Sequence, residues 1–351
     1  MNILITGNMG YIGPVVSKHL RGKFPHAKLI GLDTCFFGHC LTSTKFLPER
    51  NIDHQYFLDV RDIDHLFLKN IDVIIHLAAI SNDPIGNKFE LITDEINHKA
   101  TVNLAKKAAE SGVKRFIFAS SCSIYGAASE SPKKETDALN PISAYAKSKV
   151  SAEKGLSEID SSEMIITALR FSTACGFSAR TRLDLVLNDF VACAINDSKI
   201  TVLSDGSPWR PMIDISDMAL AIEWAIIREY DSSSSYLAIN VGADHWNFQV
   251  KDLAIAVAEI INNSEIIINK DAQPDKRSYR VNFELFKSLA PNHQPKKILK
   301  QSIEELYFGL NLIKFNDKHF RNSSFMRLKV LEDLIENKLI NSELRWNLNE
   351  G

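Results

Sequence analysis

Hydrophobic and polar positions in the first half of the chain follow two alternating patterns. Short, almost uninterrupted apolar runs are separated by longer segments in which apolar residues recur every three or four positions. The runs are NILIT (2–6), KLIGLD (28–33), DVIIHLA (72–78), FIFAS (116–120) and MIITALRF (164–171). Uninterrupted apolar runs are typical of strands buried on both faces, and their alternation with helices predicts an α/β fold with a doubly wound parallel sheet.

One long helix is predicted over residues 89–112, FELITDEINHKATVNLAKKAAESG. Its apolar positions suit one buried face, and Gly112 is a typical residue for a helix end. Those positions are Leu91, Ile96, Val102, Leu104 and Ala108.

The second half predicts a smaller unit packed on the first. Its periodic segments, 182–196, 216–229 and 249–261, predict helices, and shorter strands are predicted near 200–203 and 236–241. The tail FMRLKVLEDLIENKLI (325–340) is amphipathic. A surface helix of the smaller unit is favoured over a partner-binding helix.

Composition and charge narrow the class of protein. The 351 residues are 45% apolar and 24% charged with a net charge of −2, which is ordinary for a soluble protein and predicts neither nucleic-acid nor membrane partners. Five cysteines without a C-x-x-C pair, and no suggestive histidine spacing, argue against a disulfide framework and a metal site. The opening MNILITG carries no leader or anchor pattern, so a cytoplasmic location is expected.

The first motif with chemistry is TGNMGYIG (6–13), between a predicted strand and a predicted helix. Gly7 permits a tight turn, Gly10 lets backbone amides approach a pyrophosphate, and Gly13 allows close packing of helix on strand. Asp33 ends the second strand, twenty residues beyond Gly13. Its carboxylate can bind an adenosine ribose and would repel a 2′-phosphate, so NAD is favoured over NADP. The alternative is a plain strand-to-helix turn with a capping Asp.

The second motif pairs SSCSIYG (120–126) with YAKSK (145–149). Tyr145 and Lys149 are four residues apart, so on a helix they share one face. Moving a tyrosine pKa from about 10 to about 7 requires roughly 4 kcal/mol, which a neighbouring ammonium and a nicotinamide cation could supply. Tyr145 would then act as general base or general acid. The alternative is an exposed pair on an ordinary helix.

At this point the sequence resembles the extended short-chain dehydrogenase/reductases that modify nucleotide sugars, the group that includes UDP-glucose 4-epimerase. The resemblance rests on TGNMGYIG, Asp33, DVIIHLAA, Asn97, SSCSIYG, YAKSK, LRFSTACG and GSPWRPMIDISD. It implies a Rossmann-type NAD-binding domain over 1–175, with strands returning from about 200–203 and 236–241. It further implies that 176–351 form mostly a substrate-binding lid and C-terminal helices, and that the protein is a homodimer through a helix pair.

The resemblance also implies roles for individual residues. Ser121, Tyr145 and Lys149 are the expected catalytic residues. The expected NAD-binding residues are Gly7, Met9, Gly10, Tyr11, Ile12, Gly13, Asp33, Asp59, Val60, Leu77, Ala78, Ala79, Asn97, Tyr145 and Lys149. The expected residues for a nucleotide-sugar substrate are Ser81, Asn82, Ser121, Ser123, Thr173, Arg210 and either Arg277 or Arg280.

Departures from the family pattern favour one reaction. Family 4,6-dehydratases carry Asp and Glu where this chain has Cys122 and Ser123, and the 3,5-epimerase cysteine has no counterpart at Ser123. We therefore expect epimerisation through a keto-sugar. The alternatives are a nucleotide-sugar ketoreductase, dehydratase or decarboxylase with the same catalytic set, or an NAD-sensing regulator without catalysis.

Overall fold

The computed structural model describes residues 1–42, 45–127, 131–160, 163–229, 235–261, 264–269, 272 and 277–347. Within this part of the chain, seven parallel strands form a central sheet in the order β10-β6-β5-β4-β1-β2-β3. Their bounds are β1 Asn2–Thr6, β2 Lys28–Asp33, β3 His54–Phe57, β4 Val73–His76, β5 Arg115–Ser121, β6 Ile165–Phe171 and β10 Tyr236–Val241. The predicted doubly wound sheet is confirmed. Its order reverses at β1, where such sheets open a ligand crevice at the carboxyl ends of their strands.

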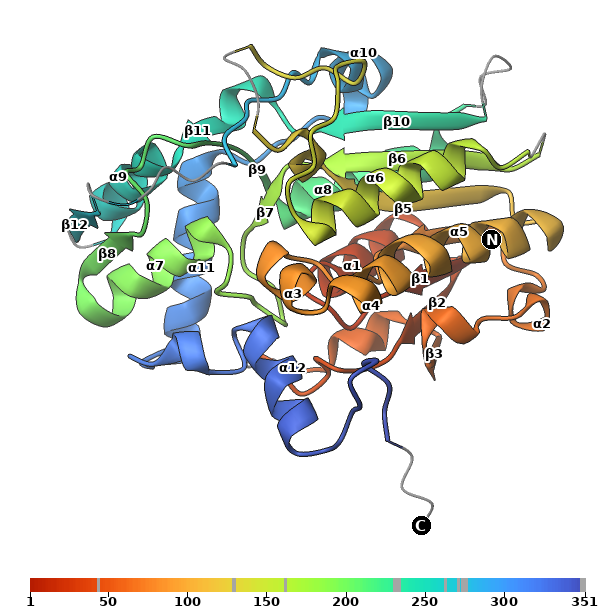
Figure 1. Ribbon diagram of the computed structural model, residues 1–351, viewed down its shortest axis with the longest axis horizontal. Coiled ribbons are helices and arrows are strands. Elements are labelled where there is room, and N and C mark those ends of the chain that lie inside the picture. Colours follow the sequence, from red (N-terminus) through yellow and green to blue (C-terminus); the bar gives the residue numbers. More distant parts are fainter. Residues whose placement is uncertain are drawn as a thin grey trace.

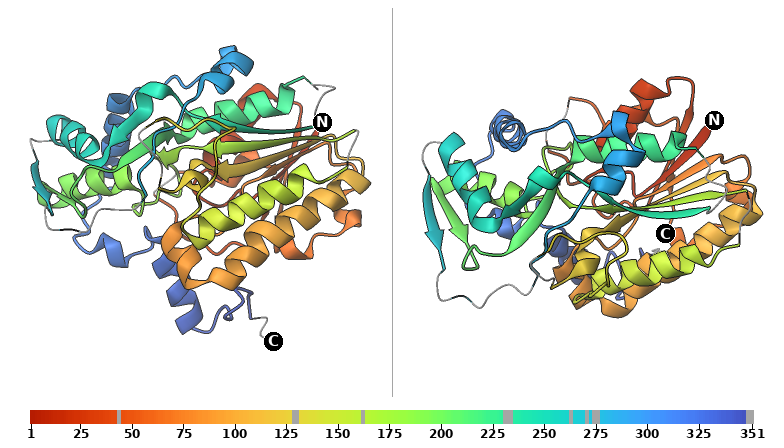
Figure 2. Two further views of the ribbon diagram at one scale, coloured as in Figure 1. Left: turned by 45° about the horizontal axis from the view of Figure 1, so that its top comes forward. Right: turned by 90° about the horizontal axis from the view of Figure 1, so that it is seen from above.

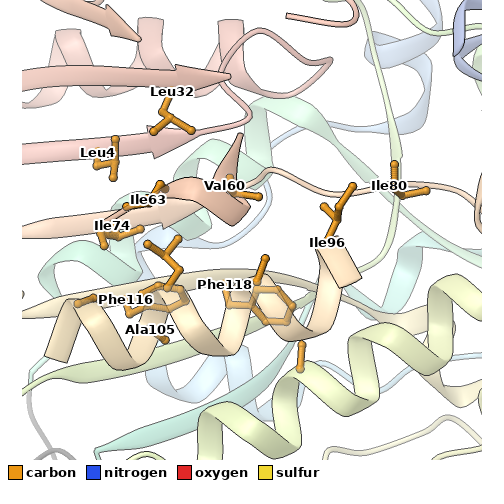
Figure 3. Close-up of a cluster of buried hydrophobic side chains, with 14 of the residues drawn as sticks. Leu4, Leu32, Val60, Ile63, Ile74, Ile80, Ile96, Ala105, Phe116 and Phe118 are labelled. Carbon is orange, nitrogen blue, oxygen red and sulfur yellow. The ribbon is translucent and has the colours of Figure 1, made fainter. Parts of the chain in front are cut away.

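Helices cover both faces of this sheet (Figure 1). One face carries α1 Gly13–Lys23, α8 Ile215–Ile227 and α10 Glu284–Leu289. The other carries α2 His65–Leu68, α3 Asp83–Lys88, α4 Glu90–Asp94, α5 Thr101–Glu110, α6 Ala144–Ser157 and α12 Arg327–Glu336. Figure 3 shows the core of that second face, where Leu4, Ile74 and Phe116 of the sheet meet Ala105 of α5.

The smaller unit lies beyond the carboxyl ends of the sheet strands (Figure 2). A three-stranded sheet contains β7 Thr173–Cys175, β9 Trp209–Asp214 and β11 Asn247–Gln249, and β8 Lys199–Val202 pairs with β12 Glu265–Ile268. Three helices share a core there: α7 Val186–Asp197, α9 Val250–Ile260 and α11 Leu299–Leu312. Short 3₁₀ helices occupy Pro48–Asn51, Val60–Asp62, Cys122–Tyr125, Asp244–Trp246, Pro291–His293 and Phe320–Asn322.

Three predictions about the second half were wrong in placement. The strand predicted near 200–203 does not return to the central sheet, because β8 pairs with β12; the strand at 236–241 does return, as β10. The helix predicted at 216–229 is α8, whose apolar side chains pack against α1 on the central sheet. The tail helix α12 packs on the sheet core rather than on the lid. A periodic pattern identifies a buried helix face but not the surface that buries it.

The helix predicted over 89–112 is interrupted. Between α4 and α5, residues Glu95–Ala100 form a π-helical turn. A π turn accommodates one more residue than an α turn, so it rotates the preceding segment relative to the following one. Leu91, expected on the buried face, is accordingly 83% exposed.

None of the helices in the described part of the chain has the length and apolarity needed to cross a membrane. The division of the chain near residue 175 stays a prediction.

Candidate active site

A cavity of about 800 Å³ lies at the carboxyl ends of the sheet strands, between the sheet and the smaller unit. Most residues predicted for the site line it: Gly7, Gly10, Tyr11, Ile12, Asp33, Asp59, Val60, Leu77, Ala78, Ala79, Ser81, Asn82, Ser121, Ser123, Tyr145, Lys149, Thr173, Arg210 and Arg277. Met9, Gly13, Asn97 and Arg280 are not among its lining residues.

Backbone atoms of the glycine-rich loop line their part of the cavity. Gly7 has a φ of +72°, and a Cβ there would lie 2.6 Å from the amide nitrogen of Ala78. A Cβ at Gly13 would lie 2.1 Å from the carbonyl oxygen of Asn8, so the start of α1 is held tightly against the loop that follows β1. Amides at such a loop, opening a helix, form a cradle that fits the pyrophosphate of a dinucleotide.

Asp33 is positioned at the end of β2 by two backbone amides. Its carboxylate accepts hydrogen bonds from the nitrogens of Met9 (2.9 Å) and Cys35 (2.7 Å). Burial raises the pKa of this carboxyl, and the two amide bonds act against that rise. Asp59, at the end of β3, accepts from the backbone and guanidinium of Arg61. Polar groups at the ends of β2 and β3 therefore line the side of the cavity where the sequence predicts the adenosine of NAD, which we call the adenosine side.

Tyr145 and Lys149 lie one turn apart on α6. The helix is capped by Ser143, whose hydroxyl accepts from the nitrogen of Ala146 and donates to Asp83. The Tyr145 hydroxyl is hydrogen-bonded to the side chain of Ser121, at the end of β5. Lys149 donates to the carbonyl oxygen of Ala119 at 2.7 Å. The sheet end and the helix start thus bring the three predicted catalytic side chains to one wall of the cavity.

Burial sets the titration of this pair. Lys149 is only 3% exposed, so the alternative of an exposed pair on a surface helix is wrong. Burial raises the pKa of Tyr145 to about 12, and the hydrogen bond from Ser121 acts against it. Burial also lowers the pKa of Lys149 to about 7, opposed by the negative charge of Glu153. In the protein without a ligand, the Tyr145 hydroxyl therefore stays protonated at neutral pH.

A buried ion pair connects β6 to α6, the helix that carries Tyr145 and Lys149. Arg170 on β6 donates to Glu153 on α6 at 2.7 Å, and the hydroxyl of Ser120 donates to the same carboxylate at 2.5 Å. The thiol of Cys122 donates to the carbonyl oxygen of Arg170, and burial raises its pKa above the ordinary range. A thiol held as the neutral donor is no nucleophile.

Three consecutive residues after β4 are each contacted by a residue from the second half of the chain. Ser81 accepts from the guanidinium of Arg182 at 2.9 Å. The amide of Asn82 donates to Asp184 at 2.8 Å, and its oxygen caps α3. Asp83 accepts from Arg277 at 2.7 Å. Ser81 and Asn82, which were predicted as substrate contacts, and Asp83 therefore anchor the opposite wall of the cavity.

The predicted residues outside the cavity lining have other contacts. The carboxamide of Asn97 exchanges two hydrogen bonds with the backbone of Ile80 and donates to Ser148 on α6. The guanidinium of Arg280 lies 5.1 Å from the ring centre of Trp209. Among the lining residues, the Tyr11 hydroxyl donates to the carbonyl of Gly176 at 2.6 Å. Direct contacts of Asn97 and Arg280 with a ligand stay predictions.

Sequence reasoning missed the lining residues Arg182, Asp184, Tyr279 and Arg327. Arg182 is buried and pairs with Asp184 at 2.8 Å. Residue 182 was placed inside a predicted helix, whereas α7 begins at Val186 and the residue before it is extended. The charged residues at every second position of RTRLD (180–184), just ahead of an apolar run, were the available signal.

The comparisons agree with this geometry. The NAD dependent epimerase/dehydratase family model matches residues 3–242, and the chain belongs to this family. NAD is therefore its cofactor. A Bacillus subtilis protein named as an uncharacterized UDP-glucose epimerase is 32% identical over 63% of this chain and 71% of that relative. The UDP-glucose 4-epimerase of Lactobacillus helveticus is 26% identical over 70% of this chain and 77% of that relative.

Solved structures share the fold. The NAD dependent NDP-hexosamine 5,6-dehydratase TunA has a TM-score of 0.76 at 20% identity, covering 89% of this chain and 98% of that chain. The UDP-glucuronic acid 4-epimerase of Bacillus cereus has a TM-score of 0.74 at 22% identity, covering 89% of this chain and 100% of that chain. At these identities the likeness establishes architecture and not the reaction.

Proposed function

We propose that this protein is an NAD-dependent epimerase of a nucleotide-activated sugar, with Tyr145 as the general acid/base. The observation that carries the proposal is the convergence of Ser121, Tyr145 and Lys149 on one wall of the cavity that also contains Gly7 and Asp33. NAD, held by the glycine-rich loop and Asp33, would supply the acceptor for a hydride from a sugar carbon and then the donor that returns it.

The side chains of the protein move the proton and hold the substrate. Ser121, bonded to the Tyr145 hydroxyl, orients the reacting sugar oxygen, and the Tyr145 phenolate takes its proton. After the keto-sugar has rotated in the site so that it presents its other face, the same tyrosine returns the proton to the sugar oxygen. Lys149 is held between the carbonyl of Ala119 and the nicotinamide side of the cavity, where its ammonium favours the phenolate.

The opposite wall is proposed to bind the nucleotide. Arg210 on β9 lines the cavity and suits a bidentate grip on the substrate pyrophosphate, with Arg277 as the second cation. Relatives and neighbours whose names carry UDP-sugars make UDP-activated sugars the first substrates to test. The hydroxyl oxygen of Ser123 is buried, finds no hydrogen-bond partner among the described residues, and belongs to a residue that lines the cavity. We propose that it binds a sugar hydroxyl.

The decisive experiment separates epimerisation from the alternatives. The purified protein is incubated in D₂O with UDP-, dTDP- and GDP-sugars, without added cofactor, and products are followed by NMR and mass spectrometry. Epimerisation by hydride return is expected to give an isomer with no carbon-bound deuterium. A product that has lost water, or that carries solvent deuterium on carbon, would contradict epimerisation and indicate a dehydratase. Strict dependence on added NADH or NADPH would instead indicate a reductase.

The NAD-sensing alternative is tested by the same assay. A regulator would bind NAD and turn over none of the sugars.

We also propose, from family resemblance, a homodimer formed through helices on the α4–α5–α6 face of the sheet, where Leu91 of α4 is exposed. Light scattering tests this, because Leu91→Arg is expected to shift a dimer towards monomer.

A further inference from the structure

The last part of the described chain, residues 326–347, packs where the adenosine half of NAD is expected. We call it the C-terminal segment; it comprises α12 and the chain that turns back from it toward β2 and β3 (Figure 1). Val330, Leu331 and Leu334 of α12 belong to the core cluster of the central sheet, together with Ile340 and Leu344. The segment is therefore an integral part of the sheet layer and not a loose tail.

The C-terminal segment contacts the chain directly after Asp33. The indole nitrogen of Trp346 donates to the carbonyl oxygen of Thr34 at 2.5 Å, and its ring lies 5.7 Å from the ring of Phe36. Thr34 and Phe36 both line the cavity directly after Asp33. The contact thus holds the loop from which a ribose-binding carboxylate projects.

The loop after β3 is held in the same way. Arg61, paired with Asp59, donates to the backbone carbonyls of Glu343 (2.9 Å) and Leu344 (3.1 Å). Arg345 forms an ion pair with Asp62 at 2.6 Å. Two loops that line the adenosine side are therefore tied to one short stretch of the C-terminal segment.

The segment also places a cation in the cavity wall. Arg327 is buried, lines the cavity, and lies 4.9 Å from the ring centre of Phe37. Its guanidinium donates to the carbonyls of Ser324 and Arg180, and within the described part of the chain no carboxylate is in ion-pair contact with it. A buried cation without an anion is costly, so a ligand anion at this wall offsets the cost.

We propose that the C-terminal segment is part of the NAD site: it closes the adenosine end of the cavity and slows NAD release, with Arg327 turned to the anionic part of the cofactor. The inference rests on NAD binding, which follows from the family, and not on the reaction proposed above. A protein that retains NAD but converts no nucleotide sugar would remove the proposed function and leave this inference standing.

The test measures NAD exchange in the double variant Arg345→Ala/Trp346→Ala. Loaded protein is mixed with excess isotope-labelled NAD, and the bound isotope is followed by mass spectrometry after rapid desalting. Loss of one ring contact and one partly exposed ion pair is expected to speed exchange on the order of tenfold. Lys199→Ala, which breaks the β8–β12 ion pair with Glu265, is the matched control and is expected to exchange at the wild-type rate. Equal rates in all three proteins overturn the proposal.

Two further measurements keep the proposal testable if the double variant is unstable. In the unaltered protein, backbone amides of residues 339–347 are expected to exchange hydrogen more slowly with NAD bound than without it; equal exchange overturns the closure. For Arg327, the lysine variant keeps the charge and the glutamine variant removes it. Arg327→Gln is expected to purify with several-fold less NAD than Arg327→Lys, and equal NAD content in the two overturns the role of the charge.

Discussion

The two walls of the cavity are built on different principles. The first wall consists of strand ends and the helix α6, and its side chains follow the sequence closely: Gly7 after β1, Asp33 at the end of β2, Ser121 at the end of β5. The second wall is assembled from Arg182, Asp184 and Arg277, which meet only because the second half of the chain packs on residues 81–83. Parallel strands align their carboxyl ends whatever the sequence between them, whereas a lid has no such rule.

The first wall is most sharply tested by Tyr145→Phe. Removal of the hydroxyl deletes the proton-transfer group, so turnover of the nucleotide sugar is expected to fall about 10³-fold. NAD content, measured on nucleotide released by denaturation, is expected to stay at the wild-type level. Tyr56→Phe on exposed β3 is the matched control. Substantial turnover by the Tyr145 variant would exclude Tyr145 as the acid/base.

Lys149 makes a pH-dependent prediction for the NAD-free protein. Its pKa is about 7 in the folded protein and 10.5 in an unstructured peptide, so between these values the unfolded chain binds more protons and stability rises with pH. Below pH 7 both states are protonated and the burial cost is largest. Lys149→Met removes that cost, which is on the order of 4 kcal/mol, so its advantage over wild type should be greatest near pH 6 and shrink towards pH 10.

Urea unfolding at pH 6, 7.5 and 9 measures this difference, with Lys154→Met, exposed on the same helix, as the control. A stability difference that stays constant across the three pH values would contradict the buried titration of Lys149.

The second wall is tested through its buried ion pair. Arg182→Gln leaves the Asp184 carboxylate without its guanidinium, which is expected to cost about 3 kcal/mol of unfolding free energy. The double variant Arg182→Gln/Asp184→Asn removes both charges and is expected to recover most of that loss. Denaturant unfolding of the wild type, Arg182→Gln, Asp184→Asn and the double variant gives the coupling energy. Additive losses would show that the pair does not act as a unit.

The smallest expected effect separates the lid arginines. Arg277 is largely exposed, so Arg277→Ala should change stability by less than about 1 kcal/mol. It should nevertheless raise the KM for the nucleotide sugar, because Arg277 lines the cavity, and Arg280→Ala should leave KM near the wild-type value. Arg210→Ala should raise KM more than either. A larger KM effect at Arg280 than at Arg277 would reverse the assignment.

Sequence reasoning reached the first wall because local motifs and strand ends coincide there. The runs NILIT and KLIGLD became β1 and β2, and TGNMGYIG and Asp33 followed them into the cavity. It also recovered the helical pair Tyr145 and Lys149. What it could not supply was the burial of that pair, which sets the pKa of each group and depends on packing from distant segments.

Of the second wall, sequence reasoning predicted Arg210 and Arg277 but missed Arg182 and Asp184, for a physical reason. Arg182 belongs to a periodic apolar pattern that begins before the helix does, because Leu183 and Leu185 are buried or partly buried in the non-helical chain ahead of α7. The same pattern could not say that α8 and α12 pack on the central sheet. Hydrophobic periodicity reports that a face is buried; only the three-dimensional packing decides against what.

At the π turn Glu95–Ala100, the regular α-helix that the local sequence favours is interrupted, and the interruption positions Asn97. The sequence from Leu91 to Ala108 would suit an uninterrupted α-helix, and such a helix would bury Leu91. The extra residue instead rotates Asn97 inward, where its amide joins the backbone after β4 to Ser148 on the helix that carries Tyr145. The helix is thus locally frustrated, because it departs from regular α-helical geometry at the position where Asn97 fixes β4 relative to α6. Deleting one residue of the π turn would make the helix regular, but it would also turn Asn97 away from its hydrogen bonds. The alignment of β4 with α6 would then be lost.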